Sequence, residues 1–293
     1  MFIGNQKIVQ FLSKVAGSNK IAQAYLFSGP ERVGKFTLAK IFAKSLIQRK
    51  PSKLENDNKN IPDLIIIEPE VEEKKGVIKE KDIKIEKIRE IQKDLALFPY
   101  SGKFKVLIIN NAHRMTVSAQ NALLKILEEP NETSVIILIT HEESKILPTI
   151  KSRCQKLSFS LASAEEIVNI VSDSKEAKKL AVFSMGRPGL ALEIKENKDI
   201  FDLRNEHLNC LNRFHSMGIN ERFNLSEKLS SNISELINFL EFWVWIIRIE
   251  ALKRGERKFF NFQTIEKIGK SLEIIKNTNA NVRLVIENLF LEI

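Results

Sequence analysis

Short runs of apolar residues alternate with helical patterns along the first half of the chain. The runs are mostly β-branched and contain no polar residues, as expected of strands buried on both faces of a parallel sheet. They cover Ala24–Phe27, Leu64–Ile67, Val106–Ile109 and Val135–Ile139. Apolar residues at helical spacing lie around them, over residues 6–15, 34–47, 83–97 and 117–127. The alternation predicts an α/β fold with a central parallel sheet.

From about residue 163 the strand patterns stop, and helical patterns continue to residue 293. The most apolar window, Phe239–Ile247, contains Glu241 and falls far short of the ~20 residues that cross a bilayer, so it predicts a buried helix. The first residues turn polar at once, unlike a signal peptide. We therefore expect a cytoplasmic protein with no membrane partner. Two stretches rich in Lys, Glu and Asn, 48–62 and 70–82, predict solvated loops.

Composition agrees with a folded protein of two or three domains. Of the 293 residues, 43% are hydrophobic and 28% are charged. Two cysteines are too few for a disulfide framework or a four-cysteine zinc site, and they suit a reducing compartment. The net charge is 46 − 37 = +9, and +8 of it falls in residues 1–199 (33 basic, 25 acidic side chains). This excess favours a polyanionic partner such as nucleic acid.

A phosphate-binding loop is predicted where the first strand meets the next helix. Gly29 and the pair Gly34-Lys35 have the G-x-x-x-x-G-K spacing. In this motif backbone N–H groups surround phosphate oxygens, and the lysine supplies a positive charge. A chance glycine turn is the alternative, but both the spacing and the strand–loop–helix context favour the phosphate loop.

The residues that would hold a metal ion and activate water are absent. The position after Lys35 needs a hydroxyl for Mg²⁺, but Phe36 stands there. Thr37 is rotated by ~100° around the helix and cannot simply replace it. The strand ending at Ile109 should be followed by acidic residues, but Asn110 and Asn111 follow it. We expect no hydrolysis here and no metal, and we leave nucleotide binding by Gly29, Gly34, Lys35 and Thr37 open.

Three further segments carry a family resemblance. Residues 23–30, 119–130 (with Leu-Leu-Lys-Ile-Leu-Glu-Glu-Pro) and 152–154 (Ser-Arg-Cys) occur in this order. Together they resemble the clamp-loader ATPases of the AAA+ superfamily, and the degenerate ATP site is similar to that of the delta-prime subunits of bacterial DNA polymerase III. The similarity continues at residues 185–192 and 279–284, so it covers most of the chain.

The resemblance implies three domains and a set of partners. The domains would be an AAA+ P-loop domain over 1–160, a helical lid over 161–198 and a helical collar over 199–293. The collar would assemble with other clamp-loader subunits (gamma/tau, delta) into a five-membered ring. That ring uses ATP to open a sliding clamp and close it around primer–template DNA. ATP would be bound by a partner subunit, and this chain would need no cofactor of its own.

Arg153 is the residue to which the resemblance gives an active role. In the family, the arginine of Ser-Arg-Cys reaches into the neighbouring subunit's ATP site. A guanidinium there offsets charge on the transferring phosphoryl group. Such an arginine, called an arginine finger, raises the rate of phosphoryl transfer roughly 10³–10⁵-fold. Without the resemblance, a weak surface ion pair would be the preferred interpretation.

Other family features are absent or altered. The four zinc-binding cysteines are missing from residues 44–68, so we expect no zinc. Thr140 matches a polar sensor position, whereas the lid sensor position falls on Gly189, which makes Arg187 a surface residue by expectation. Cys154 should be buried and unreactive, and Trp243 and Trp245 should be core or interface residues. The four histidines show no metal-ligand spacing and are expected to be ordinary surface or packing residues: His113, His141, His207 and His215.

Three alternatives remain open at this point. An ATP-hydrolysing motor subunit of the gamma/tau type would need a hydroxyl at position 36 and carboxylates at positions 110 and 111. A stand-alone DNA-binding protein would use the basic excess and bind with a steep salt dependence. A phosphate-loop kinase or other transferase is opposed by the same missing metal ligands.

Overall fold

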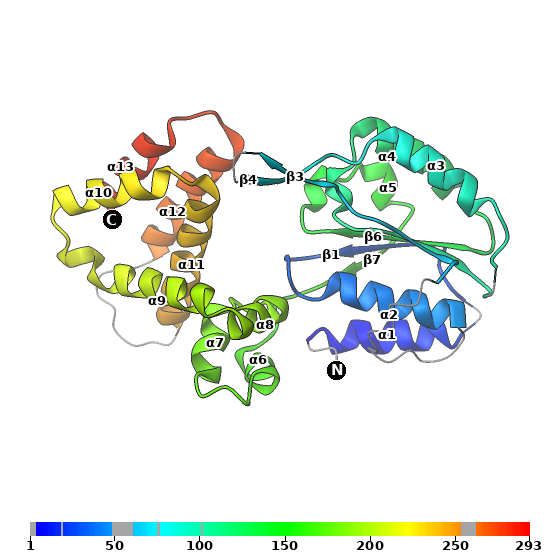
Figure 1. Cartoon of the computed structure of the whole chain (residues 1–293), viewed down its shortest axis with the longest axis horizontal. Helices are drawn as coiled ribbons and strands as arrows, with labels where there is room; N and C mark the ends of the chain where they lie inside the picture. Colours follow the sequence, from blue (N-terminus) through cyan, green and yellow to red (C-terminus); the bar gives the residue numbers. More distant parts are fainter. Residues whose placement is uncertain (1–3, 19, 49–60, 75–76, 101, 253–261) are drawn as a thin grey trace. The chain divides into compact units, whose positions relative to one another are not determined.

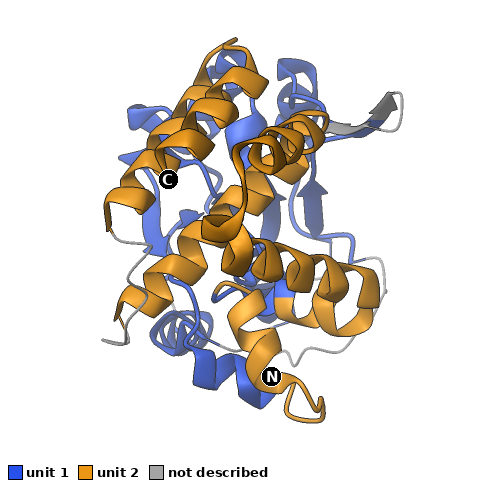
Figure 2. Cartoon of the chain, turned by 90° about the vertical axis from the view of Figure 1, so that its left-hand side faces the viewer, with its two compact units in different colours: residues 1–170, 186–190 blue, residues 171–185, 191–293 orange. Residues whose placement is uncertain are grey.

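The chain folds into two compact units, coloured separately in Figure 2. The computed structural model describes residues 4–18, 20–48, 61–74, 77–100, 102–252 and 262–293. Unit 1 consists of residues 1–170 and 186–190, and unit 2 of residues 171–185 and 191–293. A short segment near residue 188 thus returns to unit 1 after the chain has entered unit 2. The finer division into three domains stays a prediction.

Unit 1 is built on a parallel sheet. Within the described residues the sheet has five strands in the order β2-β5-β6-β1-β7, and all neighbouring strands run parallel. Their bounds are β1 (Ala24–Ser28), β2 (Leu64–Ile67), β5 (Lys105–Ile109), β6 (Ser134–Thr140) and β7 (Gln155–Ser158). The four strands predicted from apolar runs are confirmed to within a residue or two.

Two details of the sheet differ from the prediction. β2 is an edge strand, so only Ile67 of its four residues is buried, and Ile66 is 39% exposed. Its apolar run had predicted burial on both faces. β7 has no apolar run, since Gln155, Lys156 and Ser158 are polar and exposed. It pairs with β1 through backbone hydrogen bonds at the other edge, where polar side chains meet water.

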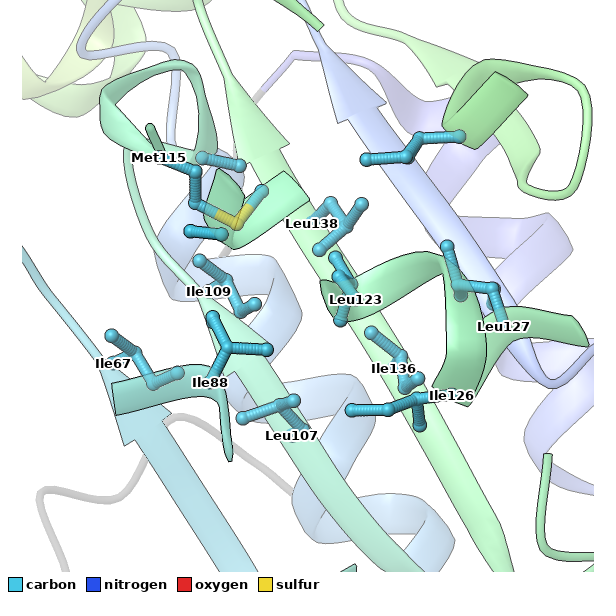
Figure 3. Close-up of a cluster of buried hydrophobic side chains, with 14 of the residues drawn as sticks. Ile67, Ile88, Leu107, Ile109, Met115, Leu123, Ile126, Leu127, Ile136 and Leu138 are labelled. Carbon is cyan, nitrogen blue, oxygen red and sulfur yellow. The ribbon is translucent and has the colours of Figure 1, made fainter. Parts of the chain in front are cut away.

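Helices cover both faces of this sheet, as Figure 1 shows for α1 and α2 on one side and α3, α4 and α5 on the other. Their bounds are α1 (Gln6–Ala16), α2 (Lys35–Gln48), α3 (Ile85–Leu95), α4 (Val117–Glu128) and α5 (Pro148–Lys151). Side chains alternate along β1, β5 and β6, so each strand contributes to both cores. Figure 3 shows the core beneath α3 and α4, where Leu107, Leu123 and Leu138 meet. The predicted α/β fold is confirmed.

The predicted loop over residues 70–82 is wrong in part. Residues Val71–Lys74 (β3) and Val77–Glu80 (β4) form an antiparallel hairpin. Polar composition suggested a loop, but each of the two segments satisfies the backbone groups of the other, and this pairing needs no buried face. The hairpin ends beside the carboxyl ends of β2 and β5, because Asn111 donates a hydrogen bond to Glu80 (2.8 Å). The other predicted loop, 48–62, lies mostly outside the described residues.

Unit 2 is helical. Its longer helices are α9 (Lys198–Arg213), α10 (Ile219–Ser230), α11 (Ile233–Leu252), α12 (Phe262–Asn277) and α13 (Val282–Glu292). The preceding short helices are α6 (Ala164–Ile170), α7 (Ala177–Phe183) and α8 (Pro188–Glu196). Of these, α6 and the first three residues of α8 belong to unit 1. Trp243 is fully buried against Phe214, Phe239 and Phe290. Trp245 is partly buried and donates to the carbonyl of Val182 (2.9 Å). None of the helices in the described ranges is long and apolar enough to cross a membrane.

Candidate functional site

The loop between β1 and α2 has the backbone conformation of a tight, glycine-dependent turn. Gly29 has φ of 144°, and a Cβ added there would lie 2.3 Å from the carbonyl oxygen of Phe159. Gly34 has φ of 91° and Arg32 has φ of 60°, both in the left-handed region. The two motif glycines are therefore required by geometry. The loop leads directly into the N-terminus of α2, the arrangement that binds anions in other proteins.

Lys35 points back to its own loop. Its Nζ donates hydrogen bonds to the carbonyl oxygens of Gly29 (2.6 Å) and Pro30, and the residue is only 6% exposed. Burial lowers the pKa of Lys35 to about 8, opposed by the charge of Glu31 and assisted by that of Arg187. The ammonium group is thus partly neutralised near pH 8 and already has two acceptors.

The segment of residues 186–190 lies against the phosphate loop. The backbone N–H of Gly189 donates to the carbonyl of Arg32 (2.9 Å), and a Cβ at Gly189 would lie 3.0 Å from that oxygen. Arg187 is partly buried, and its charge acts on Lys35. Arg187 is thus less exposed than the expected surface residue, although it is not fully buried. No local pattern indicates this proximity, because about 150 residues separate Arg187 from the loop.

The position that should coordinate Mg²⁺ is apolar. Phe36 is partly buried in the core beneath α1 and α2, and the Nζ of Lys40 lies 4.5 Å from its ring centroid. Thr37 follows it on α2 and is also partly buried. A phenyl ring has no lone pair for a metal ion, so the residues present do not fit a Mg²⁺–nucleotide complex of the usual kind.

Asn110 and Asn111 follow β5 and use their amide groups as hydrogen-bond donors. Asn110 donates to Glu68 (2.9 Å) and Asn111 donates to Glu80 (2.8 Å). Asn111 also has φ of 49°, a left-handed conformation that asparagine tolerates better than most residues. Neither amide carries the charge that a metal ion or an attacking water would need here. Because β1, β6 and β5 are neighbouring parallel strands, the loop after β1 and the residues after β5 lie at the same carboxyl end of the sheet. The seven predicted positions there are Gly29, Gly34, Lys35, Phe36, Thr37, Asn110 and Asn111.

Two histidines also come together at this carboxyl end of the sheet. His113 lies in the short helix η1 (Ala112–Arg114) after β5, and His141 follows β6. Their ring centroids are 4.1 Å apart, and Glu142 lies beside both. Burial lowers the pKa of His113 to about 4, so its imidazole is neutral at pH 7. The linear spacing of the histidines did not indicate this grouping, because spacing along the chain does not show that parallel strands bring their carboxyl ends together.

Thr140, the predicted sensor position, is fully buried beside these histidines. Its Oγ1 accepts a hydrogen bond from the backbone N–H of Glu142 (3.0 Å) and lies 3.4 Å from Nδ1 of His113. It therefore caps the turn after β6 and contacts the ring of His113. This second contact follows from the adjacency of β5 and β6, which the sequence alone does not give.

Arg153 lies just after α5, away from the phosphate loop of its own chain. Its Nη2 donates to Oε1 of Glu128 at the end of α4 (2.8 Å), and its Nη1 donates to the carbonyl of Thr149 (3.2 Å). The side chain is 37% exposed and that of Glu128 is 49% exposed. The surface ion pair considered for Arg153 is therefore present in this chain. The next residue, Cys154, packs against the core, and burial raises the pKa of its thiol to about 11, as expected of an unreactive cysteine.

A phosphate loop on a five-stranded parallel sheet with helices on both faces defines a P-loop α/β protein of the AAA+ class. The family model described as DNA polymerase III, delta subunit, matches residues 4–163. The chain therefore belongs to this clamp-loader family.

Individual relatives agree with this assignment. The chain is 33% identical over 180 residues to DNA polymerase III subunit tau of Bacillus subtilis, covering 61% of this chain and 32% of that protein. It is 32% identical over 192 residues to subunit delta' of Pseudomonas aeruginosa, covering 60% of this chain and 56% of that protein. The chain thus spans between about a third and about three fifths of these relatives. A gamma subunit-related protein of Thermotoga maritima shares the fold, with a TM-score of 0.53, 19% identity, and coverage of 98% and 97%.

Proposed function

We propose that this chain is a delta-prime-type subunit of the DNA polymerase III clamp loader. In this role it hydrolyses no ATP, serves as a scaffold and donates Arg153 to the ATP site of a neighbouring subunit. Its partners are the gamma/tau and delta subunits in a five-membered ring, which acts on the sliding clamp and on primer–template DNA. It requires no cofactor of its own.

The observation that carries this proposal is the chemistry at the ends of β1 and β5. Phe36 replaces the metal-binding hydroxyl, and the amide groups of Asn110 and Asn111 replace carboxylates. Lys35, the one charged residue of the motif that remains, is hydrogen-bonded to its own loop. All these features act in the same direction, since each of them weakens metal or phosphate binding.

The contacts of Arg153 are compatible with a role as an arginine finger in the ATP site of another subunit. The side chain is partly exposed and is held by the exposed carboxylate of Glu128. An exposed ion pair of this kind contributes at most about 1 kcal/mol, so its exchange for a triphosphate costs little. Planar guanidinium groups also match phosphate oxygens better than an ammonium does.

Two alternatives have weaker support. The relatedness to tau is consistent with an ATP-hydrolysing subunit of the gamma/tau type. This chain, however, has no hydroxyl at position 36 and no carboxylates at positions 110 and 111. A stand-alone DNA-binding protein would rest on the net charge alone. We therefore favour the delta-prime role.

The proposal is tested in a clamp loader reconstituted from purified subunits with this chain as one member. Arg153→Ala should lower the ATPase activity stimulated by DNA and clamp at least tenfold, while size-exclusion chromatography shows an intact complex. Arg89→Ala is a matched control, because Arg89 is exposed on α3 of the same unit. Unchanged activity in an assembled Arg153→Ala complex would refute the finger role.

A second measurement separates the scaffold from the finger. ATPase activity is compared between the loader assembled with and without this chain. If the chain does not enter the complex, the clamp-loader assignment fails. If it enters and the isolated chain hydrolyses ATP with a rate that Lys35→Ala abolishes, the motor alternative replaces the present one.

A further inference from the structure

A cluster of metal-ligating side chains lies at the carboxyl ends of two neighbouring strands. β5 leads into η1, which carries His113, and β6 leads into His141 and Glu142. β5 and β6 pair in parallel from Lys105↔Ser134 to Ile109↔Leu138, which brings these two chain segments together. The potential ligand atoms of the three side chains all lie within 4.8 Å of one another.

The distances within the cluster approach those of a coordination shell. Nε2 of His113 and Nε2 of His141 each lie 3.7 Å from Oε1 of Glu142. A tetrahedral zinc ion with ligands at about 2.0–2.1 Å places neighbouring ligand atoms about 3.3–3.4 Å apart. A contraction of a few tenths of an ångström would therefore bring each imidazole–carboxylate distance to the value for one ion, and all three ligand atoms lie within 4.8 Å of one another. At 3.7 Å the atoms are too far apart for direct hydrogen bonds.

The surroundings of the cluster orient these atoms. Oγ1 of Thr140 lies 3.4 Å from Nδ1 of His113. In the tautomer that carries its proton on Nδ1, this group donates to Oγ1 and leaves Nε2 free to bind a metal ion. Lys145 binds the other carboxylate oxygen, because its Nζ lies 2.7 Å from Oε2 of Glu142. This leaves Oε1 facing the two imidazoles.

We propose that His113, His141 and Glu142 bind a single Zn²⁺ ion. Two imidazoles and one carboxylate are a donor set of catalytic zinc sites, where a water molecule completes the tetrahedron. His113 is buried, whereas His141 and Glu142 are partly exposed, so the cluster lies between the interior of unit 1 and solvent. Imidazole ligands suit zinc and related transition metals and disfavour Mg²⁺, which prefers oxygen.

The site differs from both metal sites considered in the sequence. It shares no residue with the degenerate magnesium position at Phe36, Asn110 and Asn111. It also shares none with a four-cysteine zinc module, whose cysteines are missing. The ion would instead join the segment after β5 to the segment after β6. It would also add positive charge near the phosphate loop, since Lys35 and Glu31 already act electrostatically on His141.

Zinc binding to the full chain tests the proposal directly. The protein is stripped with a chelator, dialysed and titrated with Zn²⁺ in a calorimeter, with Co²⁺ as a spectroscopic substitute. We expect a stoichiometry of one, four-coordinate visible bands for cobalt and no competition from millimolar Mg²⁺. Zinc should also raise the melting temperature, because it binds the folded chain and its preformed ligands.

Variants of the two partly exposed ligands avoid a folding defect at buried His113. His141→Ala and Glu142→Gln should each weaken zinc binding by at least the roughly 10–100-fold that loss of a supporting partner costs. His215→Ala is the control, since His215 lies in the short helix η3 (Phe214–Ser216) of unit 2. Circular dichroism confirms that each variant is folded. A chain that binds no zinc, or one whose affinity falls equally in His215→Ala, overturns the proposal.

Discussion

The ammonium group of Lys35 donates a 2.6 Å hydrogen bond to the carbonyl of Gly29, six residues earlier in the same loop. A lysine that serves a phosphate must leave such acceptors, and this one is also buried and has a pKa lowered to about 8. The loop therefore keeps the shape of a phosphate site while its lysine stabilises the loop itself.

Nucleotide binding by the isolated chain should accordingly be weak. We expect no saturable binding of ATP below about 1 mM in calorimetry, with or without Mg²⁺. Lys35→Ala should leave the titration unchanged. Micromolar binding that Lys35→Ala abolishes would contradict this prediction.

Gly29→Ala should destabilise the protein by about 2 kcal/mol or more, measured as the free energy of unfolding in urea. The added Cβ would lie 2.3 Å from the Phe159 carbonyl, at a φ that favours glycine. Gly269→Ala is the control. No atom lies within 4 Å of its added Cβ, so the better helix propensity of alanine should stabilise α12 by about 0.5–1 kcal/mol.

Leu123→Ala should cost about 2–5 kcal/mol of unfolding free energy, because this fully buried side chain of α4 leaves a cavity in the core of unit 1. Val117 lies on the same helix and is 64% exposed. Val117→Ala should therefore change the free energy of unfolding by less than about 0.5 kcal/mol. Equal effects of the two substitutions in urea unfolding would mean that this core is not as described.

Stability should fall when the pH is lowered from about 6.5 towards 4, in part because of His207. Burial, with help from Arg204 and Lys228, lowers the pKa of His207 to about 4, so the unfolded chain binds a proton that the folded chain does not. The stabilisation is complete above the unfolded pKa of about 6.5 and is lost below it, by up to about 3 kcal/mol. His207→Gln should flatten the urea midpoint plotted against pH. If the plot of urea midpoint against pH is unaltered in His207→Gln, groups other than His207 determine the pH dependence of stability.

Arg153→Ala should change the stability of the isolated chain by no more than about 1 kcal/mol, because the pair with Glu128 is exposed. Thermal unfolding at low and high salt measures this directly. A larger loss would mean that Arg153 is needed for folding, and the ATPase test of the finger would then need Arg153→Lys.

The sequence predicted the fold well where the physics is local. Apolar runs marked β1, β2, β5 and β6, since a strand between two helical layers must be apolar on both faces. β7 and the hairpin of β3 and β4 were not predicted, because they pair through backbone hydrogen bonds, which nearly any side chain allows. Helical periodicity also predicted the all-helical second half of the chain.

The candidate site was predictable only where its residues are adjacent in the chain. The phosphate loop and the pair Asn110-Asn111 could be identified from short motifs. The approach of His113 to His141 depends on which strands are neighbours, and the burial of Arg187 depends on a segment that returns late to unit 1. Apolar patterns predict strands but do not give their order, so these relationships required the structure.

The hydrogen bond from Gly189 to Arg32 sets an order of events during synthesis. Domains generally fold from the N-terminus as the chain leaves the ribosome, and the phosphate loop is made within the first 35 residues. Its contact with Gly189 nevertheless cannot form until more than 150 further residues have been added. A shortened gene product that stops at Ile170 would therefore carry the whole sheet but leave one side of its loop without this support.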